Sequence, residues 1–130
     1  MTLVSASAVL LSGSALAQAP APPAGGEDLA EAERLFYEGE RLSQAGDIEA
    51  ACDAYIRSWD LSPRGAALFN VAKCNVRRGK LATAAPQLHQ VMDLARQAGR
   101  EKAAAEAEGM IREIEPRIPR VRVQVPPQTA

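Results

Sequence analysis

A repeat of 33 residues constrains the fold of this chain more than any other feature of its sequence. When the sequence is shifted by 33 residues against itself, Leu35 aligns with Leu68 and Phe36 aligns with Phe69. Further positions match in size or turn type: Gly39 with Ala72, Gly46 with Gly79, Ile48 with Leu81, Ala51 with Ala84 and Tyr55 with Leu88. A repeat of this length predicts a solenoid, in which each unit buries its apolar face against its neighbours.

Each repeat predicts a pair of helices, and the first helix has the clearest pattern. Leu35, Gly39 and Leu42 recur at the spacing of one helix face. Asp28 is expected to cap the amino end of this helix, and Glu31 is expected to complete a capping box. Gly46 is expected to end it, because glycine adopts the left-handed conformation that follows a last helical turn.

The other helices are predicted from the same signals. Asp47 is expected to cap the second helix, and Ser62-Pro63 is expected to end it and to open the third. The third helix should run to Arg78, and a fourth should cover about residues 83–97, with Pro86 in its first turn. The inward positions of these three helices are predicted to be Ile48, Ala51, Tyr55, Ser58, Leu68, Val71, Ala72, Val76, Leu88, Val91, Met92 and Ala95.

A fifth helix is predicted over residues 100–115. It is rich in alanine, glutamate and lysine, which suits a terminal cap that covers the last apolar face and shows its other side to water. The whole chain is 47% hydrophobic but only 4% aromatic. We therefore expect the core to form by close helix–helix contacts between small side chains.

These residues resemble the tetratricopeptide repeat over about residues 27–97. The matching signature positions are Gly39, Gly46, Ala51, Tyr55 and Pro63 in the first unit, and Leu68, Ala72, Gly79, Ala84 and Leu88 in the second. The sequence departs from the motif at Glu38, Asn75 and Arg96. The resemblance implies an all-α fold over residues 27–115: an antiparallel α-hairpin stack of two repeats with a capping helix.

A narrower resemblance involves Leu35 to Gly39, Ala51-Cys52, Ala72 to Cys74 and Glu115 to Pro119. These runs resemble a myxobacterial-type group of exported repeat proteins, in which a small β-sandwich domain of the PEGA kind often follows the helices. Valine alternates with polar residues from Val121 to Val125, which predicts a strand. Residues 116–130 are therefore expected to form an extended tail that begins a downstream β domain, of which this chain would be a fragment.

The amino-terminal residues predict export. The first 26 residues carry no charge, and Leu3 to Leu16 are apolar or small. Ala15-Leu16-Ala17 fits a signal-peptidase site, so residues 1–17 are predicted to be a signal peptide. Residues 18–26 are rich in proline, alanine and glycine and should form an extended linker. An uncleaved membrane anchor and a buried core helix remain alternatives. We expect a periplasmic or secreted protein.

The sequence contains no pattern that predicts catalysis. His89 is the only histidine, and no metal-binding, nucleotide-binding or paired acid–base motif is present. The net charge of −1 provides no overall field that would attract nucleic acid. We expect no cofactor, no metal and no nucleic-acid partner, and membrane association only through an uncleaved signal or a missing domain.

Cys52 and Cys74 are the only cysteines. They fall on the predicted second and third helices, which are neighbours in a repeat stack. Export would place them in an oxidising compartment, where a disulfide closing a loop of about 20 residues contributes about 3 kcal/mol. The alternative is two buried thiols that act as small apolar side chains.

Phe36 and Phe69 occupy equivalent places in the first helix of each pair. The tetratricopeptide resemblance implies that these helices line a concave face, so the two rings would form an apolar strip for a partner. The alternative is that both rings pack in the core. The candidate partner-binding residues are Phe36, Tyr37, Phe69, Asn70, Lys73 and Arg77. Glu106 is expected on the outer face.

We therefore predict a non-catalytic scaffold of the cell envelope that binds a protein or peptide, with self-association as an alternative for so short a stack. A structural spacer that presents a missing PEGA-like domain is the first alternative function. An accessory module of a larger enzyme is the second.

Overall fold

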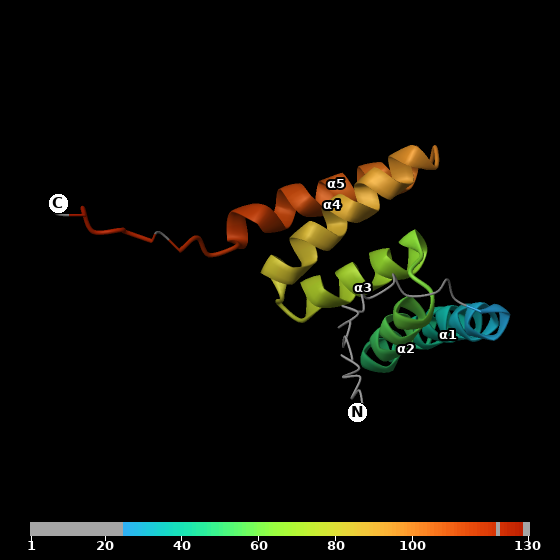
Figure 1. Ribbon diagram of the computed structural model, residues 1–130. Coiled ribbons are helices and arrows are strands. Elements are labelled where there is room, and N and C mark those ends of the chain that lie inside the picture. The colour runs from blue at the N-terminus through green and yellow to red at the C-terminus, as the bar shows by residue number, and fades with distance from the viewer. Residues whose placement is uncertain (1–24, 122, 129–130) are drawn as a thin grey trace, which may run out of the picture.

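The computed structural model describes residues 25–121 and 123–128, and within them the protein is all-α. The helices are α1 (Gly26–Gln44), α2 (Ile48–Leu61), α3 (Gly65–Arg77), α4 (Leu81–Gln97), α5 (Glu101–Ile114) and the short 3-10 helix η1 (Glu115–Arg117). Each α-helix packs against the next one along the chain. The α1 and α2 helices lie at one end, α4 and α5 at the other, and α3 between them (Figure 1). The all-α prediction is confirmed.

Three of the connections use the same glycine turn. Gly46, Gly79 and Gly99 have φ values of 85°, 71° and 69°, which glycine adopts without the steric cost of a Cβ. The residue after each glycine donates its N–H back to a helix carbonyl, as Asp47 does to Leu42 at 3.0 Å. This is the Schellman pattern that ends helices. The left-handed conformation predicted for Gly46 is confirmed.

The predicted helix caps divide between one success and two errors. The Asp47 carboxylate accepts a hydrogen bond from the Ala50 N–H at 3.3 Å, as predicted. Asp28 does not cap α1, because the helix begins two residues earlier at Gly26 and has Gly25 as its N-cap. Glu31 does not reach back to the helix start, because it pairs with Arg34 at 2.8 Å.

The connection between α2 and α3 also differs from the prediction. Ser62 is extended, with φ −148° and ψ 100°, as expected for a residue that precedes proline. Ser62 and Pro63 lie outside both helices, and α3 begins at Gly65 with Arg64 as its N-cap. The prediction that Ser62-Pro63 opens the third helix is wrong.

Pro86 lies deeper in its helix than predicted. Because α4 begins at Leu81 instead of Thr83, Pro86 falls after the first turn. Proline there leaves the carbonyl of Ala82 without its usual helical donor. Both Pro86 and Ala82 are exposed, so water can satisfy that carbonyl.

The core has two connected clusters of buried side chains. One joins α3, α4 and α5, and its members include Leu68, Ala72, Leu81, Ala84, Leu88, Val91, Ala107, Ile111 and Ile114. The other joins α2 and α3 through Ala51, Cys52, Tyr55, Val71 and Cys74. Trp59 packs against both clusters. The predicted inward positions Leu42, Ile48, Val76 and Met92 are only partly buried.

The carboxyl-terminal tail leaves the helical body (Figure 1). The structure assigns no strand within residues 118–121 and 123–128. Val121, Val123 and Val125 are 86%, 80% and 76% exposed. A single strand cannot form its backbone hydrogen bonds without a partner, so pairing of this segment with a downstream β domain stays a prediction.

The predicted signal peptide, residues 1–17, and most of the predicted linker, residues 18–26, lie outside the described residues. Gly26 already belongs to α1, so the helical domain begins one residue earlier than predicted. None of the helices that the structure describes is long and apolar enough to span a membrane.

Candidate functional site: an aromatic groove

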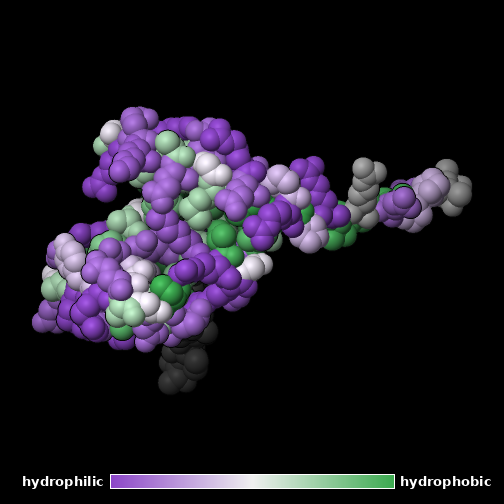
Figure 2. Space-filling model, turned by 180° about the vertical axis from the view of Figure 1, so that it is seen from behind, coloured by the Kyte–Doolittle hydropathy of each residue, from purple (hydrophilic) through white to green (hydrophobic). Residues whose placement is uncertain are grey.

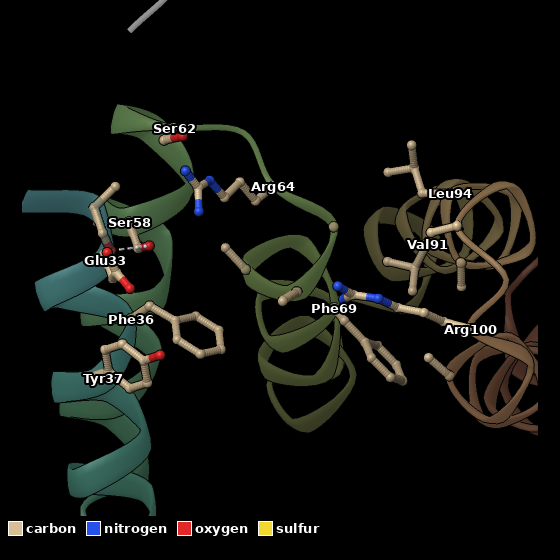
Figure 3. Close-up of a pocket in the computed structure, with 17 residues that line it drawn as sticks. Glu33, Phe36, Tyr37, Ser58, Ser62, Arg64, Phe69, Val91, Leu94 and Arg100 are labelled. Atoms are coloured by element: carbon tan, nitrogen blue, oxygen red, sulfur yellow. Dashed lines mark hydrogen bonds between the residues drawn. The ribbon is translucent and has the colours of Figure 1, made fainter. Parts of the chain in front are cut away.

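A groove of 640 Å³ opens along the helical body, and we call it the aromatic groove. Its wall on one side comes from α1 and the end of α2; the other side comes from α3, the end of α4 and the start of α5 (Figure 3). Its lining residues are Ala32, Glu33, Phe36, Tyr37, Ser58, Ser62, Arg64, Gly65, Ala66, Ala67, Phe69, Val91, Leu94, Ala95, Ala98, Arg100 and Ala103.

The two phenylalanines each pack against the core and line this groove. Phe36 packs against the α2–α3 cluster, with its ring centroid 5.8 Å from that of Tyr55. Phe69 packs against the cluster of α3, α4 and α5. Both rings are partly buried, so the two interpretations drawn from the sequence, core packing and groove lining, describe the same side chains.

Two apolar side chains leave more of their surface open. Tyr37 is 61% exposed on α1, and its ring meets that of Phe36 edge to face at 5.7 Å. Leu94 is 38% exposed on α4, on the opposite wall (Figure 3). Elsewhere, on the face shown in Figure 2, apolar residues form small patches among polar ones. The groove therefore combines open apolar side chains on two facing walls with a hollow between them.

A buried hydrogen bond joins α1 and α2, the two helices that form one wall of the groove. The Ser58 hydroxyl on α2 donates to the Ala32 carbonyl on α1 at 2.6 Å, and this bond is buried. Ser62, at the end of α2, is also buried, at 6% exposure. A buried hydroxyl is tolerated only when it has a partner, so the Ser58 bond holds α1 and α2 in one register along this wall.

The polar candidate residues lie elsewhere. Asn70, Lys73 and Arg77 line a second depression of 250 Å³, which also contains Cys52 and Cys74. The six residues predicted as one site therefore divide into an aromatic set in the groove and a polar set in this depression. Asn70, Lys73 and Arg77 lie along one side of α3, next to the side that carries Phe69, so the groove and the depression are neighbours on this helix.

The polar set is also largely occupied by contacts within the chain. Asn70 donates to Glu40 at 3.2 Å. The Lys73 ammonium pairs with Glu106 at 2.8 Å and lies 4.0 Å from the centroid of the Phe69 ring. Glu106 was expected on the outer face, and this ion pair shows that it turns toward α3 instead.

Tyr55 anchors a short polar network beside this depression. Its hydroxyl donates to Glu40 at 2.6 Å, and the same carboxylate oxygen accepts from Asn70. Burial, together with the hydrogen bond to Glu40, raises the pKa of Tyr55 above its ordinary value. The network links α1, α2 and α3, and no sequence pattern indicates the part played by Glu40.

A disulfide joins Cys52 on α2 to Cys74 on α3. Both sulfurs belong to the core, since the two residues are 1% and 4% exposed. The Cα atoms are 5.8 Å apart, within the usual range for a disulfide. The bond fixes α2 against α3, and these helices carry opposite walls of the aromatic groove.

Three charged residues line the groove that the sequence analysis did not select: Glu33 on α1, Arg64 before α3 and Arg100 before α5. All three are exposed. Each arginine directly precedes a helix, which is the only local sign of its position. Nothing in the linear sequence places Arg64 and Arg100 in one groove.

The described residues include no group of three or more His, Cys, Asp or Glu side chains that could hold a metal ion. His89 is exposed and lies 2.8 Å from Glu115, and it does not line the groove. Comparisons with protein-family models, curated proteins and solved structures find no match to this chain. The geometry of the groove therefore carries the functional argument alone.

Proposed function

We propose that this protein binds a peptide segment of a partner in the aromatic groove and acts as a scaffold without catalysis. The observation that carries the proposal is the groove itself: 640 Å³ of open space with Tyr37 and Leu94 exposed on facing walls. Sites that hold ligands are typically concave, largely apolar and about 300–1,000 Å³ in volume.

The chemistry of the lining supports an apolar anchor from the partner. Phe36 and Phe69 line the groove, and small residues such as Ala66 and Ala67 line it on α3. Buried aromatic anchors surrounded by near-neutral contacts dominate the affinity of many interfaces. One large apolar side chain of a peptide, seated between the two phenylalanines, would provide such an anchor.

The groove is also held in place before any partner arrives. The Ser58–Ala32 hydrogen bond fixes α1 against α2, and the Cys52–Cys74 disulfide fixes α2 against α3. A site whose walls are already ordered loses less conformational entropy on binding. This preorganisation favours a binding role over that of an inert spacer.

The proposal extends to the wider architecture and location of the protein. A tetratricopeptide-like stack of two helical hairpins, capped by α5, is supported by the 33-residue repeat and by the glycine turns at Gly46 and Gly79. Export to the periplasm or beyond is supported by the signal-like segment 1–17 and by the disulfide, since disulfides persist in oxidising compartments.

The test uses two adjacent residues, of which one lines the aromatic groove and the other does not. Leu94 lines the groove, whereas Asp93 is exposed and does not. A photo-crosslinking amino acid is placed at each position in the full chain, which is then incubated with peptides selected on the protein from a random library. We expect crosslinks from position 94 and none from position 93.

A matched variant gives the second arm. Tyr37→Ser removes the exposed ring and should weaken the selected peptides by about tenfold, since an aromatic anchor contributes more than about 1 kcal/mol. Equal crosslinking from positions 93 and 94, or unchanged affinity in Tyr37→Ser, would contradict binding in the groove.

The exposed tail favours one additional role. Val121, Val123 and Val125 lie in an extended segment with their side chains in solvent. We propose that this segment pairs with the edge of a β-sheet, so that the helical body acts as a spacer for a β-rich domain. Adding that domain should protect the amide of Val123 from hydrogen exchange, and an unchanged exchange rate would contradict the pairing.

A further inference from the structure

We infer that the aromatic groove selects acidic peptides, in which an apolar side chain is flanked by carboxylates, and that Arg64 and Arg100 make this selection. The inference rests on the proposed function, because it specifies which peptide the groove takes. It depends on three observations: the direction of the two arginine side chains, their lack of acidic partners, and the charge balance of the lining.

The two arginines reach into the groove from different places. Arg64 extends from the α2–α3 connection toward Ser58, and Arg100 extends from the α4–α5 connection toward Phe69 (Figure 3). Both line the groove and both are exposed. A peptide whose apolar side chain sat near Phe69 would therefore pass close to two guanidinium groups.

Several arginines of the helical body pair with acids of the same chain, whereas Arg57, Arg77 and Arg112 have no ion pair within the described residues. Arg34 pairs with Glu31 at 2.8 Å, and Arg41 pairs with Glu38 at 2.7 Å. The Arg78 guanidinium lies 2.7 Å from Glu49. By contrast, no acidic group in the described part of the chain lies within ion-pair distance of Arg64 or Arg100. Their donors remain free for a ligand.

The charge balance of the groove favours a carboxylate. Its lining has two cations, Arg64 and Arg100, and one anion, Glu33. The amino end of α3 adds positive potential, since Gly65 and Ala66 of its first turn also line the groove. Arginine forms paired hydrogen bonds with carboxylates, so acidic side chains on the peptide would meet matched donors.

The same balance argues against two other occupants. The tail of a second copy carries Arg117 and Arg120 beside its apolar residues, so it would bring cations toward cations. A nucleic acid would require many basic contacts along its backbone, whereas the net charge of the chain is −1. An acidic peptide is the occupant that fits both the apolar base and the charged rim.

The experiment measures three labelled peptides of equal length by fluorescence anisotropy on the full chain. Each has a central phenylalanine flanked on both sides by two glutamates, two glutamines or two lysines. We expect the glutamate peptide to bind about tenfold more tightly than the glutamine peptide at low salt, and the lysine peptide to bind most weakly. The preference should shrink as salt is added, because the arginines are exposed.

Single substitutions then assign the preference to residues. Arg64→Gln and Arg100→Gln should each weaken the glutamate peptide by about two- to fivefold, the range for exposed charge pairs. Neither should change the affinity of the glutamine peptide. Arg112→Gln is the matched control, since Arg112 is exposed on α5 and lines neither hollow, and it should change nothing. In the double variant R64E/R100E, the preference should reverse toward the lysine peptide.

Each remaining outcome bears on the inference. Equal affinity for the glutamate and glutamine peptides would overturn it and leave the proposed function standing. Failure of all three peptides, while library-selected peptides still crosslink from position 94, would also overturn it. Displacement of the glutamate peptide by an equal concentration of an oligonucleotide would show a general anion site and would contradict selection of a peptide. If no peptide of any kind crosslinks, the proposed function fails first.

Discussion

The two repeat units differ in the side chains that pack between their paired helices. In the first unit, α1 and α2, Gly39 lies beneath the ring of Tyr55. In the second unit, α3 and α4, the aligned residues are Ala72 and Leu88, both fully buried. A larger side chain on one helix is thus matched by a smaller one on the other. The two units share the 33-residue spacing, but the side chains that meet at this contact differ in size between the units.

The exchange has a consequence for the contacts between the units. Tyr55 carries a hydroxyl that Leu88 lacks, and that hydroxyl joins Glu40 and, through it, Asn70 on α3. The disulfide is likewise not repeated, because Cys52 aligns with Ala85 and Cys74 aligns with Arg41. The junction between the first and second units therefore has a covalent link, whereas the junction with α5 has ion pairs such as Lys73–Glu106.

The largest expected effect concerns the covalent link. Replacing both cysteines with alanine should lower the free energy of unfolding by about 3 kcal/mol, because a disulfide spanning 22 residues restricts the unfolded chain. Urea unfolding followed by the fluorescence of Trp59, the only tryptophan, measures the change. Reduction of the native protein should give the same loss and should not affect the C52A/C74A variant. An unchanged midpoint after complete reduction would contradict the role assigned to the bond.

The next effect tests directly whether the small residue 39 is matched to the large residue 55. A Cβ at residue 39 would lie 2.6 Å from the ring of Tyr55, so Gly39→Ala should destabilise the protein by about 1–2 kcal/mol despite the better helix propensity of alanine. Tyr55→Leu should rescue this loss, because the double variant reproduces the Ala72–Leu88 pair. The double-mutant cycle should give a favourable coupling of about 1 kcal/mol or more. If the free-energy changes of the two substitutions simply add, the comparison between the two units is wrong.

A smaller effect is expected when the Tyr55 hydroxyl alone is removed. Tyr55→Phe keeps the ring and removes the hydrogen bond to Glu40, which should cost about 1–2 kcal/mol because the acceptor is a carboxylate. Asn75→Ala provides a matched control in the second unit, since it removes a single polar contact to Gln87 at 2.8 Å. We expect a smaller loss there, because both partners are neutral amides.

The smallest effect is a pH dependence. The pKa of Tyr55 is raised in the folded protein by burial, so its contribution is fully present below the unfolded value of about 10 and is lost as the pH rises above it. The stability difference between the native protein and Tyr55→Phe should be constant from pH 7 to about 9.5 and should shrink at higher pH. A difference that grew with pH would reverse the sign of the argument.

The sequence predicted correctly those helix ends and caps that depend only on residues close together in the chain. The helix ends at Gly46 and Gly79 and the cap at Asp47 follow from side-chain and backbone properties that act within one turn. Asp28 does not cap α1, because the helix begins at Gly26 with Gly25 as its N-cap, and the sequence near Asp28 did not indicate this earlier start. The alternation of valine with polar residues predicts a strand, but a strand needs a partner for its backbone hydrogen bonds, and the pattern cannot provide one.

The candidate site was predicted only in part, for a related reason. The repeat identified Phe36 and Phe69, which line the groove from equivalent helices. Arg64, Leu94 and Arg100 were missed, because they meet only when the ends of α2 and α4 come to the same side of α3. Asn70, Lys73 and Arg77 were expected to add polar contacts beside the aromatic residues, and the structure places them in the neighbouring depression.

The most direct test of the central claim maps the bound peptide on the folded protein by amide chemical shifts. The full chain, labelled with nitrogen-15, is titrated with a library-selected peptide. Binding in the aromatic groove predicts perturbations at Ala66, Phe69 and Leu94, with little change at Asp93 or at Arg77 in the second depression. Perturbations centred on Arg77 and Asn70, with Leu94 unchanged, would contradict the claim and place binding in the other hollow.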